Sequence, residues 1–193
     1  MIKSEDINEL KKYKEIKIEN LPSYNIFFIG FMGVGKTTIS SYLSKILNKK
    51  EIEIDKYISQ QENMAISQIF EKYGEKYFRD CETEVLKSLN NKNNTIVSCG
   101  GGIVLREENV NLMKRQGKII LLTASAKTIF ERVRYNDDRP ILNNNMSVEF
   151  ISSLMKKREE KYLNAADIII DTDNKSIIEV CKEIILSLNK MDI

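Results

Sequence analysis

Five short apolar runs alternate with longer stretches of helical periodicity along the chain, and this alternation limits the possible folds more than any other feature. The runs are rich in Ile, Val and Phe and occupy Tyr24–Ile29, Lys50–Ile54, Thr95–Cys99, Lys118–Leu122 and Asp167–Asp171. Strands that alternate with helices are typical of βαβ units, whose parallel strands form a sheet with helices packed on both faces. The sequence therefore predicts a three-layer α/β/α fold with a five-stranded parallel sheet.

Two of the helical stretches indicate which residues form the core. After the first apolar run, Ile39, Leu43, Ile46 and Leu47 recur at the spacing of one helix face. Near the C-terminal end the same spacing is repeated by Ile177, Cys181, Ile184, Ile185 and Leu188. We therefore expect both helices to pack on the sheet and Cys181 to be a buried thiol.

A glycine-rich segment lies between the first predicted strand and the first predicted helix. Residues 30–38 read Gly-Phe-Met-Gly-Val-Gly-Lys-Thr-Thr and match the phosphate-loop pattern G-x-x-x-x-G-K-S/T in its required context. The glycines allow successive backbone N–H groups to face an anion, and the helix N-terminus adds partial positive charge. Lys36 can reach the β- and γ-phosphates, and Thr37 can offer its hydroxyl to Mg²⁺. The motif predicts binding of ATP or GTP with Mg²⁺ but does not identify the acceptor.

The chain has 193 residues and no histidine, which excludes Ser-His and Cys-His nucleophile pairs, histidine bases and zinc-histidine sites. The 30 Lys and Arg residues against 28 Asp and Glu give a net charge of +2, so nucleic acid is not an expected partner. Cys81, Cys99 and Cys181 lie far apart in the sequence without a C-x-x-C spacing, so they indicate neither a zinc knuckle nor a disulfide framework. Without an apolar membrane span or signal-peptide pattern, we expect a cytoplasmic protein that has no membrane partner.

The second predicted strand ends in Glu53-Ile54-Asp55. Residues i and i+2 of a strand point the same way, so both carboxylates can face the cleft at the carboxyl ends of the strands. A carboxylate there can hold Mg²⁺ through water or accept a proton from an attacking hydroxyl. Spacing alone slightly favours the alternative, in which these strand-end carboxylates are simply solvated.

Three further features are weak signals in isolation. Gly100-Gly101-Gly102 follows the third strand, where it suits either close approach to a ligand or, more commonly, a plain turn. Arg79, in a segment expected to open a helix at Phe78, and Arg158 are more often surface arginines than anion clamps.

Two segments do not fit the alternation. Residues 1–23 carry a mixed-charge helical pattern that is too short for a domain, so we expect a short appended helix or a disordered extension. A helix that tethers the chain to a partner is an alternative, although the balanced charge favours a free surface helix. Residues 135–147 are rich in Asn and Asp, which is typical of a mobile loop, and they contain Arg139.

Taken in this order, these segments resemble the shikimate kinase family, the small P-loop kinases of aromatic amino-acid biosynthesis. The markers are the loop at 30–38, Glu-x-Asp at 53–55, Phe-Arg-x-x-Glu at 78–82, Gly-Gly-Gly at 100–102, Arg-Pro-Ile-Leu at 139–142, Arg-x-x-x-Tyr at 158–162 and Ala-Asp at 166–167. The resemblance covers about residues 24–190. It implies a P-loop kinase domain over residues 24–193, with a mobile lid at about 132–147, that transfers the γ-phosphoryl group of ATP to the 3-hydroxyl of shikimate.

The resemblance also implies roles for individual residues. Catalysis would use Lys36, Asp55 and Arg139, with Asp55 orienting or deprotonating the attacking hydroxyl. The nucleotide would be bound by Gly33, Val34, Gly35, Lys36, Thr37, Thr38, Arg132, Arg139 and Lys175, with Arg132 beside the adenine and Arg139 over the phosphates. Shikimate would be bound by Asp55, Arg79, Gly100, Gly101, Gly102 and Arg158, with the two arginines holding its carboxylate.

The same resemblance places Mg²⁺ at Thr37 and Glu53. Glu53 departs from the family, which usually has Asp-x-Asp at this point. Glutamate carries the same charge on an arm that is longer by one methylene group, so its geometry toward the metal is left open. Family members are usually monomers, and we expect a monomer here.

Two rival interpretations remain at this stage. One is another small-metabolite P-loop kinase, of the gluconate or nucleotide type, which we would not expect to combine paired arginines with a triple glycine. The other is a protein of the same family that binds nucleotide without turnover. Retention of Lys36, Thr37, Asp55 and Arg139 argues against that second interpretation.

Overall fold

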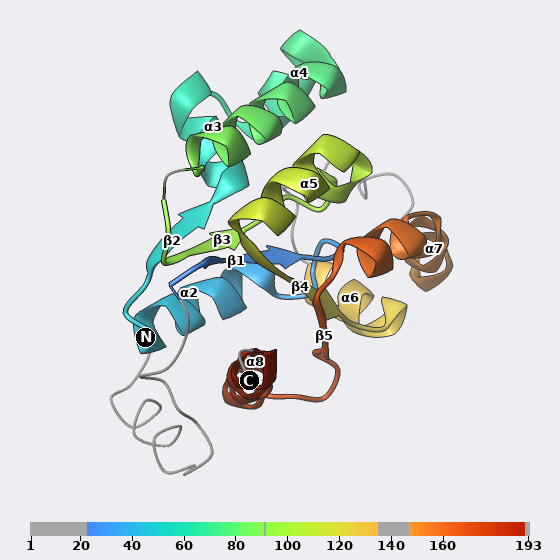
Figure 1. Ribbon diagram of the computed structural model, residues 1–193. Helices are drawn as coiled ribbons and strands as arrows, with labels where there is room; N and C mark the ends of the chain where they lie inside the picture. Colours follow the sequence, from blue (N-terminus) through green and yellow to red (C-terminus); the bar gives the residue numbers. More distant parts are fainter. Residues whose placement is uncertain (1–22, 91, 135–146, 192–193) are drawn as a thin grey trace.

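The computed structural model describes residues 23–90, 92–134 and 147–191 (Figure 1). Within these ranges, five parallel strands form one sheet in the order β2-β3-β1-β4-β5. The strands are β1 (Asn25–Ile29), β2 (Lys50–Glu53), β3 (Thr95–Ser98), β4 (Gly117–Thr123) and β5 (Ile168–Asp171). The predicted fold class and all five predicted strands are confirmed, with ends that differ by a residue. Most of the predicted N-terminal extension, most of the predicted lid, and Arg139 lie outside the described residues.

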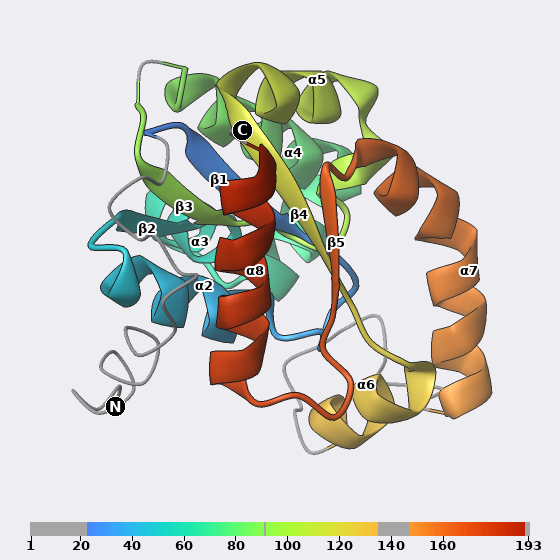
Figure 2. The same cartoon turned by 60° about the horizontal axis from the view of Figure 1, so that its bottom comes forward.

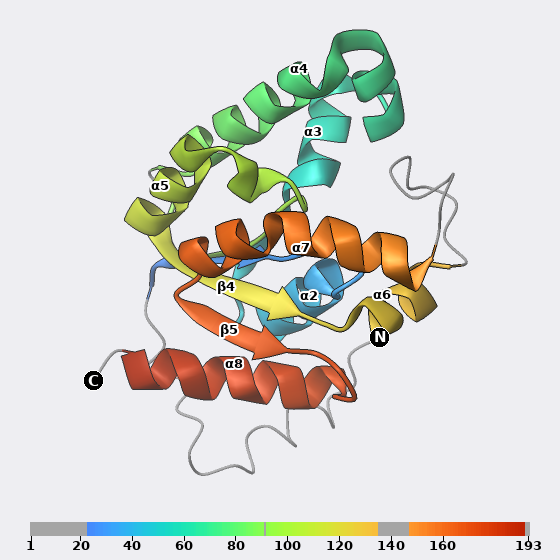
Figure 3. The same cartoon turned by 90° about the vertical axis from the view of Figure 1, so that its right-hand side faces the viewer.

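Helices cover both faces of the sheet (Figures 2 and 3). They are α2 (Lys36–Ile46), α3 (Ile54–Glu62), α4 (Ile66–Ser88), α5 (Glu107–Gln116), α6 (Ala126–Val133), α7 (Val148–Ala165) and α8 (Ile177–Met191), with a short 3₁₀ turn η2 (Ile103–Leu105). Helices α2, α6 and α8 contribute to the apolar cluster on one face, and α3, α4 and α5 to the cluster on the other. Helix α7 contributes to both clusters, through Ile151 to the first and through Tyr162 and Ala165 to the second. It lies beside α6 and β4 (Figure 3).

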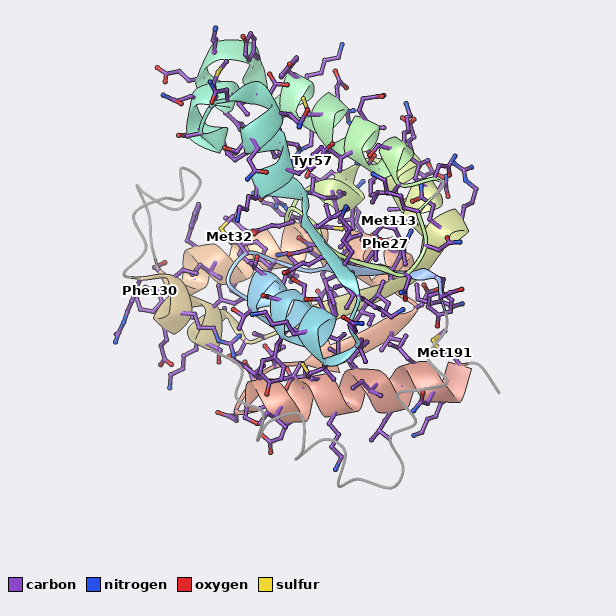
Figure 4. All side chains as sticks on the ribbon, turned by 90° about the vertical axis from the view of Figure 1, so that its left-hand side faces the viewer. Phe27, Met32, Tyr57, Met113, Phe130 and Met191 are labelled. Carbon is purple, nitrogen blue, oxygen red and sulfur yellow. The ribbon has the colours of Figure 1, made fainter. Side chains whose placement is uncertain are left out.

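The two apolar clusters follow from the alternation of side chains along each strand. In β1, Ile26 and Phe28 belong to the cluster with α2 and α8, whereas Phe27 and Ile29 belong to the cluster with α4 and α5. Phe27 and Met113 of α5 are both fully buried in the second cluster (Figure 4). Strands β1 and β3 are buried on both faces and so have no polar side, which explains their continuous apolar runs. In β5 one face is open, and Ile169 is exposed there.

The two helix faces predicted from the sequence are confirmed. Ile39, Leu43 and Ile46 of α2 are buried in the first cluster, and Leu47 packs against it from the end of the helix. In α8, Cys181 is completely buried, as predicted, and burial raises the pKa of its thiol to about 12. A thiol in that environment is a packing group and stays protonated at neutral pH.

Helix α4 is interrupted at Gly74, whose φ of 79° and ψ of 169° are not helical. This left-handed φ is costly for any residue with a side chain, so glycine marks the break. The second half of α4 therefore begins just after Gly74, slightly earlier than the opening at Phe78 expected from the sequence. None of the helices in the described ranges is long and apolar enough to cross a membrane.

Candidate active site

A cavity of about 830 Å³ opens at the carboxyl ends of the strands. The parallel register brings these ends level, since Glu53 pairs with Ser98 and Thr123 with Asp171. The cavity is lined by every predicted site residue in the described ranges, namely Gly33, Val34, Gly35, Lys36, Thr37, Thr38, Glu53, Asp55, Arg79, Gly100, Gly101, Gly102, Arg132, Arg158 and Lys175. Side chains from six separate segments of the sequence therefore meet in one place.

The phosphate loop runs from the end of β1 to the start of α2. Gly35 caps α2 with a left-handed φ of 98°, a conformation in which glycine is favoured. Lys36 Nζ donates to the backbone oxygens of Gly30 at 2.9 Å and Phe31 at 3.0 Å, so the amine lies across the loop. The loop and the α2 N-terminus thus present backbone N–H groups and a lysine to the cavity, which is the arrangement that binds phosphate.

Thr37, Glu53 and Ser98 bring three oxygen atoms together beside the loop. The Thr37 hydroxyl donates to Glu53 Oε1 at 3.0 Å and lies 3.5 Å from the Ser98 hydroxyl oxygen. Hard oxygen donors of this kind suit Mg²⁺. Among the described residues, no three or more His, Cys, Asp or Glu side chains are grouped so that they could hold a metal ion. The oxygen atoms of Thr37, Glu53 and Ser98 could hold a cation together with phosphate oxygens, the usual arrangement for Mg²⁺ in phosphoryl-transfer sites.

Glu53 and Asp55 both line the cavity, but the strand-spacing argument that placed them there is wrong. Strand β2 ends at Glu53, and Asp55 lies in the first turn of α3. The helix begins at Ile54, which is completely buried, so the chain turns from strand to helix one residue before Asp55. Asp55 therefore enters the cavity from a helix N-terminus, where a negative charge is stabilised.

Glu82 is a buried carboxylate that faces Asp55. Its side chain has no exposed surface, and Glu82 Oε1 and Asp55 Oδ1 both lie 2.6 Å from the point where a Cβ atom would sit on Gly100. Burial raises the pKa of Glu82 to about 7; the Arg79 charge opposes that shift and the Asp55 carboxylate adds to it. Two carboxylates thus lie next to Gly100, with Asp55 lining the cavity and Glu82 buried behind the lining.

Arg79 is held by carboxylates on both sides. Its Nε and Nη2 atoms donate to Glu75 Oε1 at 3.2 and 2.8 Å, and its Nη1 donates to Glu82 Oε2 at 2.8 Å. The guanidinium carbon lies 5.4 Å from the centroid of the Phe78 ring. Burial disfavours the charge, but Glu82 and Glu75 outweigh it and raise the pKa of Arg79. Arg79 is therefore a permanently charged group with a fixed orientation.

Arg158 and Tyr162 of α7 meet at the second glycine of the triple run. Arg158 Nη1 donates to the Gly101 carbonyl at 3.4 Å, and the Tyr162 hydroxyl donates to the same oxygen. Burial raises the pKa of Tyr162 to about 12, so it stays a donor at any physiological pH. The Gly101 peptide is thereby fixed at the edge of the cavity.

Arg132 joins the phosphate loop to the segment between β5 and α8. Its guanidinium donates to the carbonyl of Val34 at 3.3 Å, and to the hydroxyl and carbonyl of Thr172 at 3.0 Å each. Lys175 lines the same end of the cavity and pairs with Glu183 at 2.6 Å. Apolar side chains of Ile177 and Val180 line the cavity there as well.

Several residues of the site were given no role by the sequence reasoning. These are Glu75, Glu82, Ser98, Tyr162 and Thr172. Glu75 and Glu82 lie four and three residues from Arg79, and that helical spacing is a signal for ion pairing that could have found them. Glu82 and Tyr162 each end one of the family markers, at 78–82 and 158–162, although neither was given a role. Ser98 and Thr172 are distinguished in the sequence only by lying at the end of a strand. Polar residues are too common there to indicate a functional site.

Comparisons with known proteins match this chain to shikimate kinases in both sequence and fold. The family model for shikimate kinase matches residues 32–189. A shikimate kinase from Sulfurihydrogenibium sp. is 37% identical over 166 residues, which cover 86% of this chain and 98% of that protein. The structure of shikimate kinase from Acinetobacter baumannii in complex with shikimate superposes with a TM-score of 0.84 at 27% identity, covering 93% of this chain and 99% of that one.

A gluconokinase structure from Sinorhizobium meliloti also superposes, with a TM-score of 0.54 over 88% of this chain and 93% of that one. Its 11% identity shows a shared fold and nothing more. The family model, by contrast, matches most of the length of this chain, and the relative is matched over nearly all of its own length. The chain therefore belongs to the shikimate kinase family.

Proposed function

We propose that this chain transfers the γ-phosphoryl group of ATP to the 3-hydroxyl of shikimate, giving shikimate 3-phosphate and ADP. The observation that carries the proposal is that Lys36, Asp55, Arg79 and Arg158 line one cavity. A phosphate loop, a carboxylate and two arginines are the groups that a triphosphate, a hydroxyl and a carboxylate substrate require. A cytoplasmic monomer remains our expectation for its cellular state.

The phosphate loop binds the triphosphate through its backbone N–H groups and the N-terminus of α2. Lys36 leaves the carbonyls of Gly30 and Phe31 to meet the β- and γ-phosphates, because a phosphate oxygen carries more charge than a carbonyl oxygen. The base lies toward Arg132 and the segment that contains Lys175. In this assignment Arg132 stays anchored on Thr172 while its face meets the adenine.

Two arginines hold the carboxylate of the acceptor. Arg79 is fixed by Glu75 and Glu82, and Arg158 approaches from α7 on the other side of the triple glycine. Arginine suits this task because its planar fork matches a carboxylate and never loses its charge near neutral pH. A neutral or cationic acceptor has no carboxylate to offer to the two guanidinium groups that line the cavity.

Asp55 orients the hydroxyl that attacks the γ-phosphorus. Its carboxylate lies in the first turn of α3 and lines the cavity, and the chain has no histidine that could act as the base. Phosphoryl transfer depends mainly on positioning and charge neutralisation, so a carboxylate that accepts a hydrogen bond from the hydroxyl is sufficient. Asp55 can also accept the proton as the new ester bond forms.

Mg²⁺ fits the oxygen atoms of Thr37 and Glu53, which lie 3.0 Å apart at the edge of the phosphate loop. When bound, the ion supplies neutralisation of charge on the β- and γ-phosphates. Thr37 would hold it through its hydroxyl, and Glu53 would hold it directly or through water. Arg139, outside the described residues, completes the assignment as the arginine that covers the phosphates. Measuring ADP formation with and without shikimate tests the function as a whole.

A further inference from the structure

The triple glycine at residues 100–102 is not explained by its backbone conformation. None of these three glycines has a left-handed φ, and Gly102 has φ −104° and ψ 1°, which alanine adopts without strain. A turn alone would therefore accept residues with side chains here. The reason for glycine must lie in what surrounds the Cα atoms.

At Gly102 the surrounding group is the guanidinium of Arg79. A Cβ atom added to Gly102 would lie 2.3 Å from Nη2 and 2.4 Å from both Cζ and Nη1 of Arg79. These nearly equal distances mean that the carbon would press mainly on the face of the planar group, not on an N–H edge. Arg79 thus rests its face on the bare Cα atom of Gly102 while its edges remain available for hydrogen bonds.

The Arg79 side chain has little freedom to move away from such a carbon. Three of its five N–H bonds are used by Glu75 and Glu82, which leaves one N–H on each terminal nitrogen. Ordinary contact distances require the guanidinium to shift by about 1 Å if a methyl group were present. That shift would carry the two remaining N–H groups away from their present positions.

At Gly100 the surrounding groups are the carboxylates of Asp55 and Glu82. An added Cβ atom would lie 2.6 Å from Asp55 Oδ1 and 2.6 Å from Glu82 Oε1. Gly101 differs from both neighbours, because a Cβ atom there would meet nothing closer than 3.6 Å. An added Cβ atom would therefore clash at Gly100 and Gly102 but not at Gly101. The clashes would be with Asp55, which is assigned to the acceptor hydroxyl, and with Arg79, which is assigned to the acceptor carboxylate.

We propose that Gly100 and Gly102 are positioning residues, whose missing side chains form the space that sets the Asp55 carboxylate and the Arg79 guanidinium in place. Gly102 determines where the acceptor carboxylate is bound, and Gly100 determines where the attacking hydroxyl is held. The inference rests on the proposed function, because it names the groups through which two glycines would act on shikimate.

The test compares Gly102→Ala with Gly100→Ala, two identical methyl additions two residues apart. Gly102→Ala raises the KM for shikimate at least tenfold and leaves the KM for ATP unchanged, since a displacement of about 1 Å can cost up to 100-fold in a positioned site. Gly100→Ala instead lowers kcat at least tenfold. If both substitutions changed the same parameter, or if Gly102→Ala left the KM for shikimate within twofold, the proposal would be wrong.

A double-mutant cycle separates positioning from a general disturbance of the loop. Arg79→Lys removes the guanidinium plane, so adding Gly102→Ala to that variant raises the KM for shikimate by less than a further twofold. If the two substitutions raised the KM for shikimate by factors that multiply in the double variant, Gly102 would act independently of Arg79. Loss of a cooperative thermal melt in Gly102→Ala would also contradict the proposal, because a shift of about 1 Å in the Arg79 guanidinium changes substrate binding without unfolding the protein. The wild-type protein is assayed alongside to separate failure of this proposal from failure of the proposed function. If the wild type showed no shikimate-dependent turnover, the proposed function itself would be refuted.

Discussion

The hydroxyl of Thr37 donates a 3.0 Å hydrogen bond to the carboxylate of Glu53, joining the first turn of α2 to the end of β2. The longer arm of glutamate, where the family usually has aspartate, therefore reaches the hydroxyl assigned to Mg²⁺. Both atoms are hard oxygen donors at one edge of the phosphate loop. The departure from the family pattern keeps a carboxylate within reach of the metal position.

Replacing Glu53 by glutamine should weaken Mg²⁺ binding, because an amide oxygen lacks the negative charge that attracts the cation. We expect the Mg²⁺ concentration for half-maximal ADP formation to rise about tenfold or more, and Mn²⁺ binding followed by electron paramagnetic resonance to weaken in parallel. Glu51→Gln is the matched control, since Glu51 lies two residues away on β2 and accepts from Ser40 instead. Equal metal dependence in both variants would remove Glu53 from the metal site.

Replacing Asp55 by asparagine keeps the shape of the side chain but removes its ability to accept a proton. We expect kcat to fall by about 10²- to 10⁴-fold, while the KM for ATP changes little because the phosphate loop is intact. Steady-state kinetics with varied ATP and varied shikimate measure both quantities. Turnover at the wild-type rate would exclude Asp55 from the mechanism.

Replacing Arg158 by alanine removes a charge-assisted contact to the acceptor carboxylate. Such a contact is worth roughly 1.5–3 kcal/mol, so the KM for shikimate should rise roughly 10- to 150-fold with little change in the KM for ATP. Lys157→Ala is the control, because Lys157 is the preceding residue of α7 and is exposed outside the cavity. If the KM for shikimate stayed the same, the carboxylate would be bound elsewhere.

The buried carboxyl of Glu82 should make stability depend on pH. Its pKa of about 7 exceeds the ordinary value of 4.5, because burial favours the protonated form. The folded state therefore holds this proton more tightly than the unfolded chain does. The resulting stabilisation is complete below about pH 4.5 and is lost as the pH rises through about 7, amounting to roughly 3 kcal/mol at most.

Thermal melts of the wild type and Glu82→Gln at pH 5.5 and pH 8 measure this effect. Between these values the wild-type Tm should fall by roughly 5 °C more than the Tm of the variant, whose amide does not titrate. The absolute Tm of the variant is not the readout, since it also loses an ion pair with Arg79. Parallel pH profiles would show that Glu82 does not titrate in this range.

The sequence was sufficient to predict the sheet, because five apolar runs separated by helical stretches leave few other folds. It also predicted which residues meet at the phosphate loop, since that motif has one structural context. It did not predict how Asp55 enters the site. Strand spacing suggested a shared strand face with Glu53, but the helix begins at Ile54, one residue before Asp55. A buried isoleucine at this position fits a strand or a helix, so the sequence carried no signal for the turn.

The surroundings of Arg79 were only partly within reach of the sequence. The spacing of Glu75 and Glu82, four and three residues from Arg79, is a signal for ion pairing that the sequence reasoning did not use. The close approach of Arg79 to Gly102 joins residues that are distant in sequence. No sequence pattern shows which side chain packs against the Cα atom of a glycine, so this contact is found only in the folded structure.

The most direct test of the account is the rate of ADP formation by the purified full-length protein, measured by a coupled assay with ATP and Mg²⁺. The acceptors to compare are shikimate, quinate, gluconate, CMP and none. The account predicts rapid ADP formation with shikimate and little with any other acceptor or with none. Faster turnover on gluconate or CMP, or equal ATP hydrolysis with and without shikimate, would contradict it.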